Sequence, residues 1–162
     1  VCNIVNRLNK NSLVMFNNIS HGEFFYEIFK EKYPEREAYL LHGSNSKAED
    51  RKEIIKVMEE NDDVVLFASY GIFSTGVSIN NIHHVVLAAP TKARIRLLQT
   101  IGRGLRLHDD KDYVTLWDIT DDLTYIKRTG NKHENYTYKH CIERLKIYVE
   151  QEFDYRITRI KL

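Results

Sequence analysis

Short apolar runs alternate with segments of helical periodicity along most of the chain. Five runs predict buried strands at 13–16 (LVMF), 38–41 (AYLL), 64–68 (VVLFA), 84–88 (HVVLA) and 113–117 (YVTLW). The run at 64–68 is apolar throughout, which is expected when helices cover both faces of a parallel sheet. The pattern therefore indicates strands buried inside a layered fold.

The segments between these runs carry apolar residues at helical spacing. They predict helices over 22–33, 46–61 and 91–100, and a longer C-terminal helix that begins at 132. Pro34 ends the first of these helices, and Ser46 with Glu49 forms a capping box for the second. Gly102 follows the third. Residues 155–162, rich in β-branched and basic side chains, predict an edge strand or an ordered extension.

The order of these elements predicts an α/β fold. We expect a doubly wound, mainly parallel sheet flanked by helices, with a C-terminal helical extension. In such sheets ligands bind at the carboxyl ends of the strands. Residues 1–125 would form the main domain, and residues 126–162 an extension that packs on it or follows it.

Composition and length exclude several classes of protein. The 162 residues, 43% of them apolar, with 24 Lys plus Arg against 23 Asp plus Glu, describe one ordinary globular domain. No apolar run approaches the roughly 18 residues that cross a bilayer, so we expect no membrane span. Two distant cysteines offer neither a disulfide framework nor a metal site, which favours a cytoplasmic location. The chain begins with Val1 and lacks a secretory signal, which indicates a fragment of a longer protein.

The net charge of +1 conceals a gradient along the chain. Residues 1–90 carry 9 basic and 12 acidic side chains, whereas residues 91–162 carry 15 and 11. A polyanion is therefore expected to meet the second half or the seam between the halves. A basic stretch in that half also holds several tyrosines, which leaves a nucleic-acid contact open there: Tyr125, Lys127, Arg128, Lys132, Tyr136 and Tyr138.

Two nucleotide-binding motifs are present only in part. Residues 71–78 (GIFSTGVS) have the glycines and final serine of a phosphate loop, but Val77 replaces the lysine that neutralises phosphate. Residues 114–118 (VTLWD) form an apolar strand that ends in an acid, with no phosphate loop ahead of it. We therefore expect Asp118 to be a surface or capping carboxylate, and a stand-alone kinase or ATPase is disfavoured.

The most specific pattern is QTIGRGLR at 99–106. If Gln99 ends a helix and Gly102 breaks it, Arg103 and Arg106 project from the next turn and can converge on one anion. Two guanidinium groups beside a glutamine suit phosphoryl transfer, in which arginine stabilises the charge that spreads over the γ-phosphate oxygens. The alternative interpretation is a basic surface turn.

QTIGRGLR resembles motif VI of superfamily 2 helicases, and other motifs of that family precede it in order. Residues 13–18 (LVMFNN) resemble motif IV, 41–43 (LHG) with Arg51 resemble motif IVa, and 73–80 (FSTGVSIN) resemble motif V. The resemblance implies that residues 1–125 form the second RecA-like motor domain of an ATP-dependent DNA helicase or translocase of recombination and repair. An N-terminal RecA-like domain would carry the phosphate loop and most of the contacts with ATP and Mg²⁺. This chain alone would then be inactive.

The resemblance also implies roles for single residues. Arg103 and Arg106 would be arginine fingers that reach ATP on the partner domain, and Gln99 would couple nucleotide state to domain closure. Contacts with the nucleotide are implied for Gly102, Gly76 and Ser78, the last of which stands where many family members have Asp. Contacts with the backbone of single-stranded or branched DNA are implied for Ser74, Thr75, Gly76, Asn18, His42 and Gly43. No metal ligand is implied in this chain.

A non-catalytic adaptor is the alternative to a motor domain. A RecA-like domain that only binds nucleic acid would show salt-sensitive binding without any effect of nucleotide. Such an adaptor has no need of two arginines three residues apart.

Overall fold

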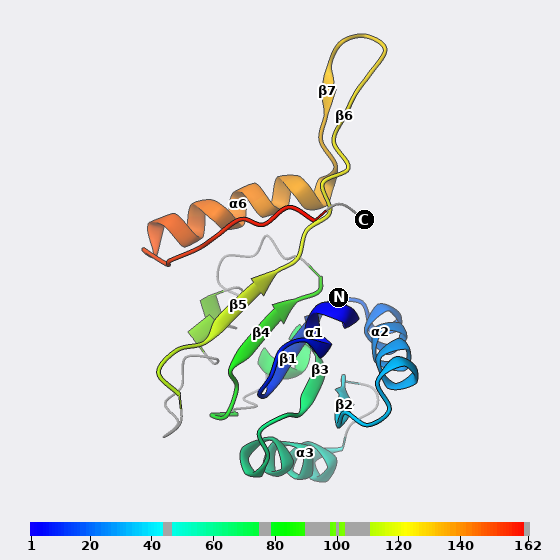
Figure 1. Cartoon of the computed structure of the whole chain (residues 1–162), viewed down its shortest axis with the longest axis vertical. Coiled ribbons are helices and arrows are strands. Elements are labelled where there is room, and N and C mark those ends of the chain that lie inside the picture. The colour runs from blue at the N-terminus through cyan, green and yellow to red at the C-terminus, as the bar shows by residue number, and fades with distance from the viewer. Residues whose placement is uncertain (44–46, 75–78, 90–97, 100, 103–110, 161–162) are drawn as a thin grey trace.

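The structure, a computed structural model, describes residues 1–43, 47–74, 79–89, 98–99, 101–102 and 111–160. In this part of the chain, five parallel strands form one sheet in the order β2-β3-β1-β4-β5 (Figure 1). The strands are β1 (Ser12–Phe16), β2 (Ala38–Leu41), β3 (Val65–Ser69), β4 (His84–Leu87) and β5 (Thr115–Asp118). Each strand overlaps a predicted apolar run, so the predicted α/β fold is confirmed.

The central strand β1 shows why the runs are continuously apolar. It pairs with β3 on one side and β4 on the other, so that Leu13 lies opposite both Leu66 and Val85. Its side chains alternate between two apolar clusters, one on each face of the sheet. Met15 faces the first cluster and Val14 the second, and both are fully buried. A strand buried on both faces has no position at which a polar side chain is preferred.

Helices cover both faces of the sheet. On one face, α1 (Cys2–Asn6) and α2 (Ile19–Lys32) pack on the cluster that contains Val14. On the other face lie α3 (Ala48–Glu60), α4 (Tyr70–Ser74) and α6 (Tyr136–Glu150). Ile147 and Tyr148 of α6 belong to the same buried cluster as Met58 of α3. The C-terminal helix is therefore built into the core of the sheet domain.

Gly22 allows α2 to lie close to the sheet, and its replacement tests this packing. A Cβ atom at Gly22 would overlap the aromatic ring of Phe16, which is fully buried. We expect Gly22→Ala to lower the free energy of unfolding by about 1–3 kcal/mol, although alanine is the better helix former. Urea unfolding should show this loss, little change for the exposed control Ser20→Ala, and partial recovery when Phe16→Leu is added. Unchanged stability in Gly22→Ala would contradict the close packing.

Several predicted helix boundaries are wrong. Helix α2 begins at Ile19, three residues before the predicted start at 22. The N-cap of α3 is Lys47, and its N–H donates to the Asp50 carboxylate at 3.0 Å, so Asp50 takes the role expected of Glu49. The predicted cap, Ser46, lies outside the described residues. The C-terminal helix begins at Tyr136 instead of 132, because the preceding residues form a hairpin of β6 (Tyr125–Ile126) and β7 (Lys132–His133).

The residues after α6 do not form an edge strand in the part that the structure describes. Glu152 has a φ of +55°, and the chain reverses there. The following residues then run back beside α6 as an extended segment (Figure 1). Phe153 packs against the core, and its N–H donates to the carbonyl of Tyr148 at 3.0 Å. The predicted ordered extension is therefore the alternative that the structure supports.

Candidate functional site

Four of the described candidate residues lie where three neighbouring strands end. Asn18 follows β1, His42 and Gly43 follow β2, and α4 with Ser74 follows β3. Because β2, β3 and β1 are adjacent and parallel, their carboxyl ends meet at one edge of the sheet. The structure thus brings candidates that are distant in sequence to a single edge, where ligands of such folds bind.

Asn18 is placed to offer its amide to a ligand. It is the N-cap residue of α2, with extended backbone angles, and its carbonyl accepts the N–H of Gly22 at 3.0 Å. Its side chain is exposed and makes no capping bond with α2. An exposed amide at the carboxyl end of the central strand can hydrogen-bond a phosphate or sugar oxygen.

His42 and Gly43 differ in accessibility. The His42 side chain is buried, and its Nε2 lies 3.3 Å from the Glu23 carboxylate of α2. Gly43 is exposed, and no atom lies within 4 Å of the position that a Cβ would occupy. The side chain of His42 thus ties β2 to α2, and the open backbone at Gly43 is the accessible part of this pair. The sequence pattern did not reveal the partner Glu23.

The glutamine of the QTIGRGLR segment is exposed on a helix. Residues 98–99 and 101–102 are helical, so Gln99 is not the last helical residue. The residues after Gly102 lie outside the described ranges, and the break expected there stays a prediction. Leu98 and Ile101 are partly buried against the main core, whereas Gln99 is exposed. Among the described residues, no atom lies within 4 Å of the position that a Cβ on Gly102 would occupy.

Several candidate residues belong to segments that the structure does not describe. Thr75, Gly76, Ser78, Arg103 and Arg106 lie outside the described residues, and so does the side chain of Ser74. Their roles remain predictions from the sequence.

Asp118, at the end of β5, forms a largely buried ion pair with α6. The fully buried Arg144 donates from Nε to Asp118 Oδ2 at 2.7 Å and from Nη2 to Asp118 Oδ1 at 2.6 Å. Arg144 Nη2 also lies 2.9 Å from Thr120 Oγ1, and the Tyr148 hydroxyl donates to Asp118 Oδ2 at 2.9 Å. The prediction of a surface or capping carboxylate at Asp118 is therefore wrong.

The pKa shifts of Arg144 and Tyr148 keep both of these side chains protonated. Burial alone would lower the pKa of the Arg144 guanidinium, but the hydrogen bonds and charge of Asp118 outweigh it and the pKa is raised. Burial, with the charge of Asp118, also raises the pKa of the Tyr148 hydroxyl, which stays protonated as a donor. An arginine in the apolar stripe of a helix was the sequence feature that could have revealed this cluster.

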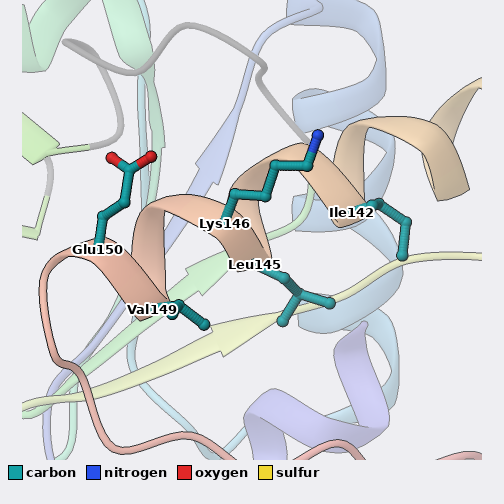
Figure 2. Close-up of a pocket in the computed structure, with 5 residues that line it drawn as sticks. All are labelled: Ile142, Leu145, Lys146, Val149 and Glu150. Carbon is teal, nitrogen blue, oxygen red and sulfur yellow. The ribbon is translucent and has the colours of Figure 1, made fainter.

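An open hollow runs along another part of α6. Figure 2 shows Ile142, Leu145 and Val149 along it, with Lys146 and Glu150 pointing away from these apolar side chains. The cation of this hollow is already paired, because Lys146 Nζ lies 2.8 Å from the Glu143 carboxylate. Its chemistry does not suit a nucleotide phosphate.

No described helix is both long and apolar enough to span a bilayer. No group of three or more His, Cys, Asp or Glu side chains in the described ranges is arranged to hold a metal ion.

Comparison with known proteins defines the class to which the chain belongs. The family described as the helicase conserved C-terminal domain matches residues 1–108, and the chain belongs to this family. The stretch from 76 to 111 moreover resembles the UvsW helicase of T-even phages. Over 159 residues the chain is 37% identical to the ATP-dependent DNA helicase uvsW of Enterobacteria phage T4. The matched region covers 94% of this chain and 31% of that protein.

Other relatives agree with this assignment. The putative ATP-dependent helicase IRC3 of Saccharomyces cerevisiae is 34% identical over 110 residues, 68% of this chain and 15% of that protein. The crystal structure of T4 UvsW matches with a TM-score of 0.79 at 36% identity, over 96% of this chain and 32% of that chain. The C-terminal domain of the DEAD-box protein Dbp5 shares the fold, with a TM-score of 0.65 at 16% identity over 92% of this chain and 76% of that one. The chain thus spans about a third or less of the helicases to which it is similar in sequence.

Proposed function

We propose that this chain is the second motor domain of an ATP-dependent DNA helicase that remodels branched DNA during recombination and repair. The observation that carries the proposal is the segment QTIGRGLR in a chain that belongs to the helicase C-terminal domain family. The choice of DNA is supported by the similarity to a protein described as an ATP-dependent DNA helicase. The chain would close on an N-terminal RecA-like domain that binds ATP and Mg²⁺.

The proposed chemistry is attack of water on the γ-phosphate of that ATP. Arg103 and Arg106 would approach from this chain and stabilise the charge that develops on the phosphate oxygens. Gln99 would transmit the state of the nucleotide to the closure of the domains, and its exposure on a helix supports this role. Gly102, Gly76 and Ser78 would line the nucleotide side of the cleft. The mechanism requires no metal ligand from this chain.

The carboxyl edge of the sheet would hold one DNA strand. Asn18 and the backbone at Gly43 are exposed there, and Ser74 begins the motif V residues Ser74, Thr75 and Gly76. Without a Cβ, Gly76 lets a phosphate approach the backbone closely. His42 would act on the strand by fixing the position of Gly43 through its contact with Glu23. Hydrolysis would change which domain holds the strand tightly.

ATP hydrolysis measured with and without single-stranded DNA tests this proposal. The full-length protein that contains this chain should hydrolyse ATP faster when DNA is added, because both domains must close around nucleotide and strand. The 162-residue chain alone should show no turnover above background, since its phosphate-loop lysine is replaced by Val77. DNA binding by the full-length protein without any nucleotide effect would instead support an adaptor and contradict the proposal.

A further inference from the structure

A two-stranded hairpin projects from the body of the protein after β5. Strands β6 and β7 pair antiparallel, and residues 127–131 connect them (Figure 1). Gly130 has a φ of +81°, and its N–H donates to the carbonyl of Lys127 at 2.8 Å, which closes the turn. Both strands are exposed. The hairpin therefore adds nothing to the core and needs another explanation.

The base of the hairpin is fixed to the domain. Asn135, the N-cap residue of α6, accepts the N–H of Leu123 on its Oδ1 at 3.0 Å and donates from Nδ2 to the carbonyl of Asp121 at 2.8 Å. The Thr137 hydroxyl donates to the same carbonyl at 3.2 Å. These bonds join the outgoing and returning segments. The base of the hairpin is thus held in a fixed position at the N-terminus of α6.

The surface of the hairpin combines positive charge with apolar and aromatic side chains. Residues 125–133 contain Lys127, Arg128 and Lys132 and no acidic residue. Lys132 pairs with Glu134 at 2.7 Å. Lys127 and Arg128, the two cations of the turn, are exposed to solvent. Ile126 is 75% exposed and lies beside them. Cations bind phosphates, whereas exposed aromatic and apolar side chains contact unstacked bases, so this combination matches nucleic acid.

The hairpin leaves the sheet at the edge that holds the candidate residues. It follows β5, and β5 is separated from the central strand β1 only by β4. With about 4.8 Å between strands, β5 lies roughly 10 Å from β1. The six residues between β5 and β6 span about 20 Å when extended. A strand held along this edge therefore meets the hairpin within a few nucleotides.

We infer that the β6–β7 hairpin contacts DNA at the point where a duplex branches from the strand held by the sheet edge. Lys127 and Arg128 bind backbone phosphates of the duplex, and Tyr125 and Ile126 present their exposed surfaces to bases at the branch. This inference rests on the proposed function, because it takes the strand at the sheet edge as given. It adds the branch point as the feature of the substrate that this chain recognises.

Binding of forked and single-stranded DNA by the full-length protein tests the inference. The double variant Lys127→Ala with Arg128→Ala should bind a fork on the order of tenfold or more weakly at about 0.1 M salt. The slope of log affinity against log salt should fall by about 2, because two phosphate contacts are lost. Affinity for single-stranded DNA and the ATP hydrolysis that it stimulates should stay at wild-type levels. Ile126→Ser should slow unwinding of a fork without changing the salt slope.

The matched control carries the same loss of charge elsewhere. Lys52→Ala with Lys56→Ala removes two exposed cations from α3 and should leave all these measurements unchanged. If the hairpin variant binds forks normally while DNA still stimulates ATP hydrolysis, the hairpin serves another partner and the inference fails alone. Equal loss of fork and single-strand binding also overturns the inference, because the hairpin then contributes to DNA binding in general and not to recognition of the branch. Absence of DNA-stimulated hydrolysis in the wild type would overturn the proposed function itself.

Discussion

Replacing Asp118 with alanine should lower the free energy of unfolding by roughly 3–5 kcal/mol. The substitution leaves the guanidinium of Arg144, which is fully buried, without its bidentate partner and removes the acceptor of the Tyr148 hydroxyl. A buried charge without a partner is costly, because it loses its hydration on folding and gains no hydrogen bonds from a partner in return. The melting temperature of a domain of this size should fall by roughly 6–20 °C. Calorimetry or thermal circular dichroism measures this change.

A double-mutant cycle separates the pair from its surroundings. Arg144→Met alone should also destabilise, whereas Arg144→Met combined with Asp118→Ala should cost much less than the sum of the single changes. Lys146→Ala is the matched control on the same helix, because it breaks an exposed pair with Glu143 and should change stability by less than about 1 kcal/mol. Additive effects of the two buried substitutions would show that the residues do not depend on each other.

The strands were predictable because both faces of the sheet are buried. Every position of β1 and β3 is buried, so the apolar runs follow directly from the packing. The order of strands in space was not predictable from these runs, because they do not show that β1 lies between β3 and β4. That order decides which candidate residues share an edge. Sequence analysis identified Asn18, Gly43 and Ser74 as candidates, and the order of the strands places them at one edge of the sheet.

The features that sequence analysis missed depend on tertiary contacts or on very short elements. Asp118 and Arg144 are 26 residues apart, and only the packing of α6 on β5 brings their charges together. The strands β6 and β7 have two residues each, too few for an alternating pattern to appear. The Gly130-Asn131 pair was the local turn signal that could have indicated this hairpin.

Replacing Arg103 with alanine should reduce DNA-stimulated ATP hydrolysis by the full-length protein roughly 10³-fold or more. An arginine finger acts on charge that develops in the transition state, so its loss lowers kcat while ATP binding is largely kept. A 10³-fold loss corresponds to about 4 kcal/mol of transition-state stabilisation. Steady-state ATP hydrolysis assays, with binding of a fluorescent ATP analogue measured in parallel, separate a loss of turnover from a loss of ATP binding.

Controls for Arg103→Ala distinguish a finger from a basic surface turn. Arg103→Lys should restore little activity, because an ammonium group cannot reproduce the planar fork of a guanidinium. Arg156→Ala removes an exposed arginine from the C-terminal extension and should hydrolyse ATP at the wild-type rate. A melting temperature close to that of the wild type would show that the Arg103→Ala variant is folded. If its turnover also equalled the wild-type value, Arg103 would not act at the γ-phosphate, and the adaptor interpretation would gain support over the motor domain.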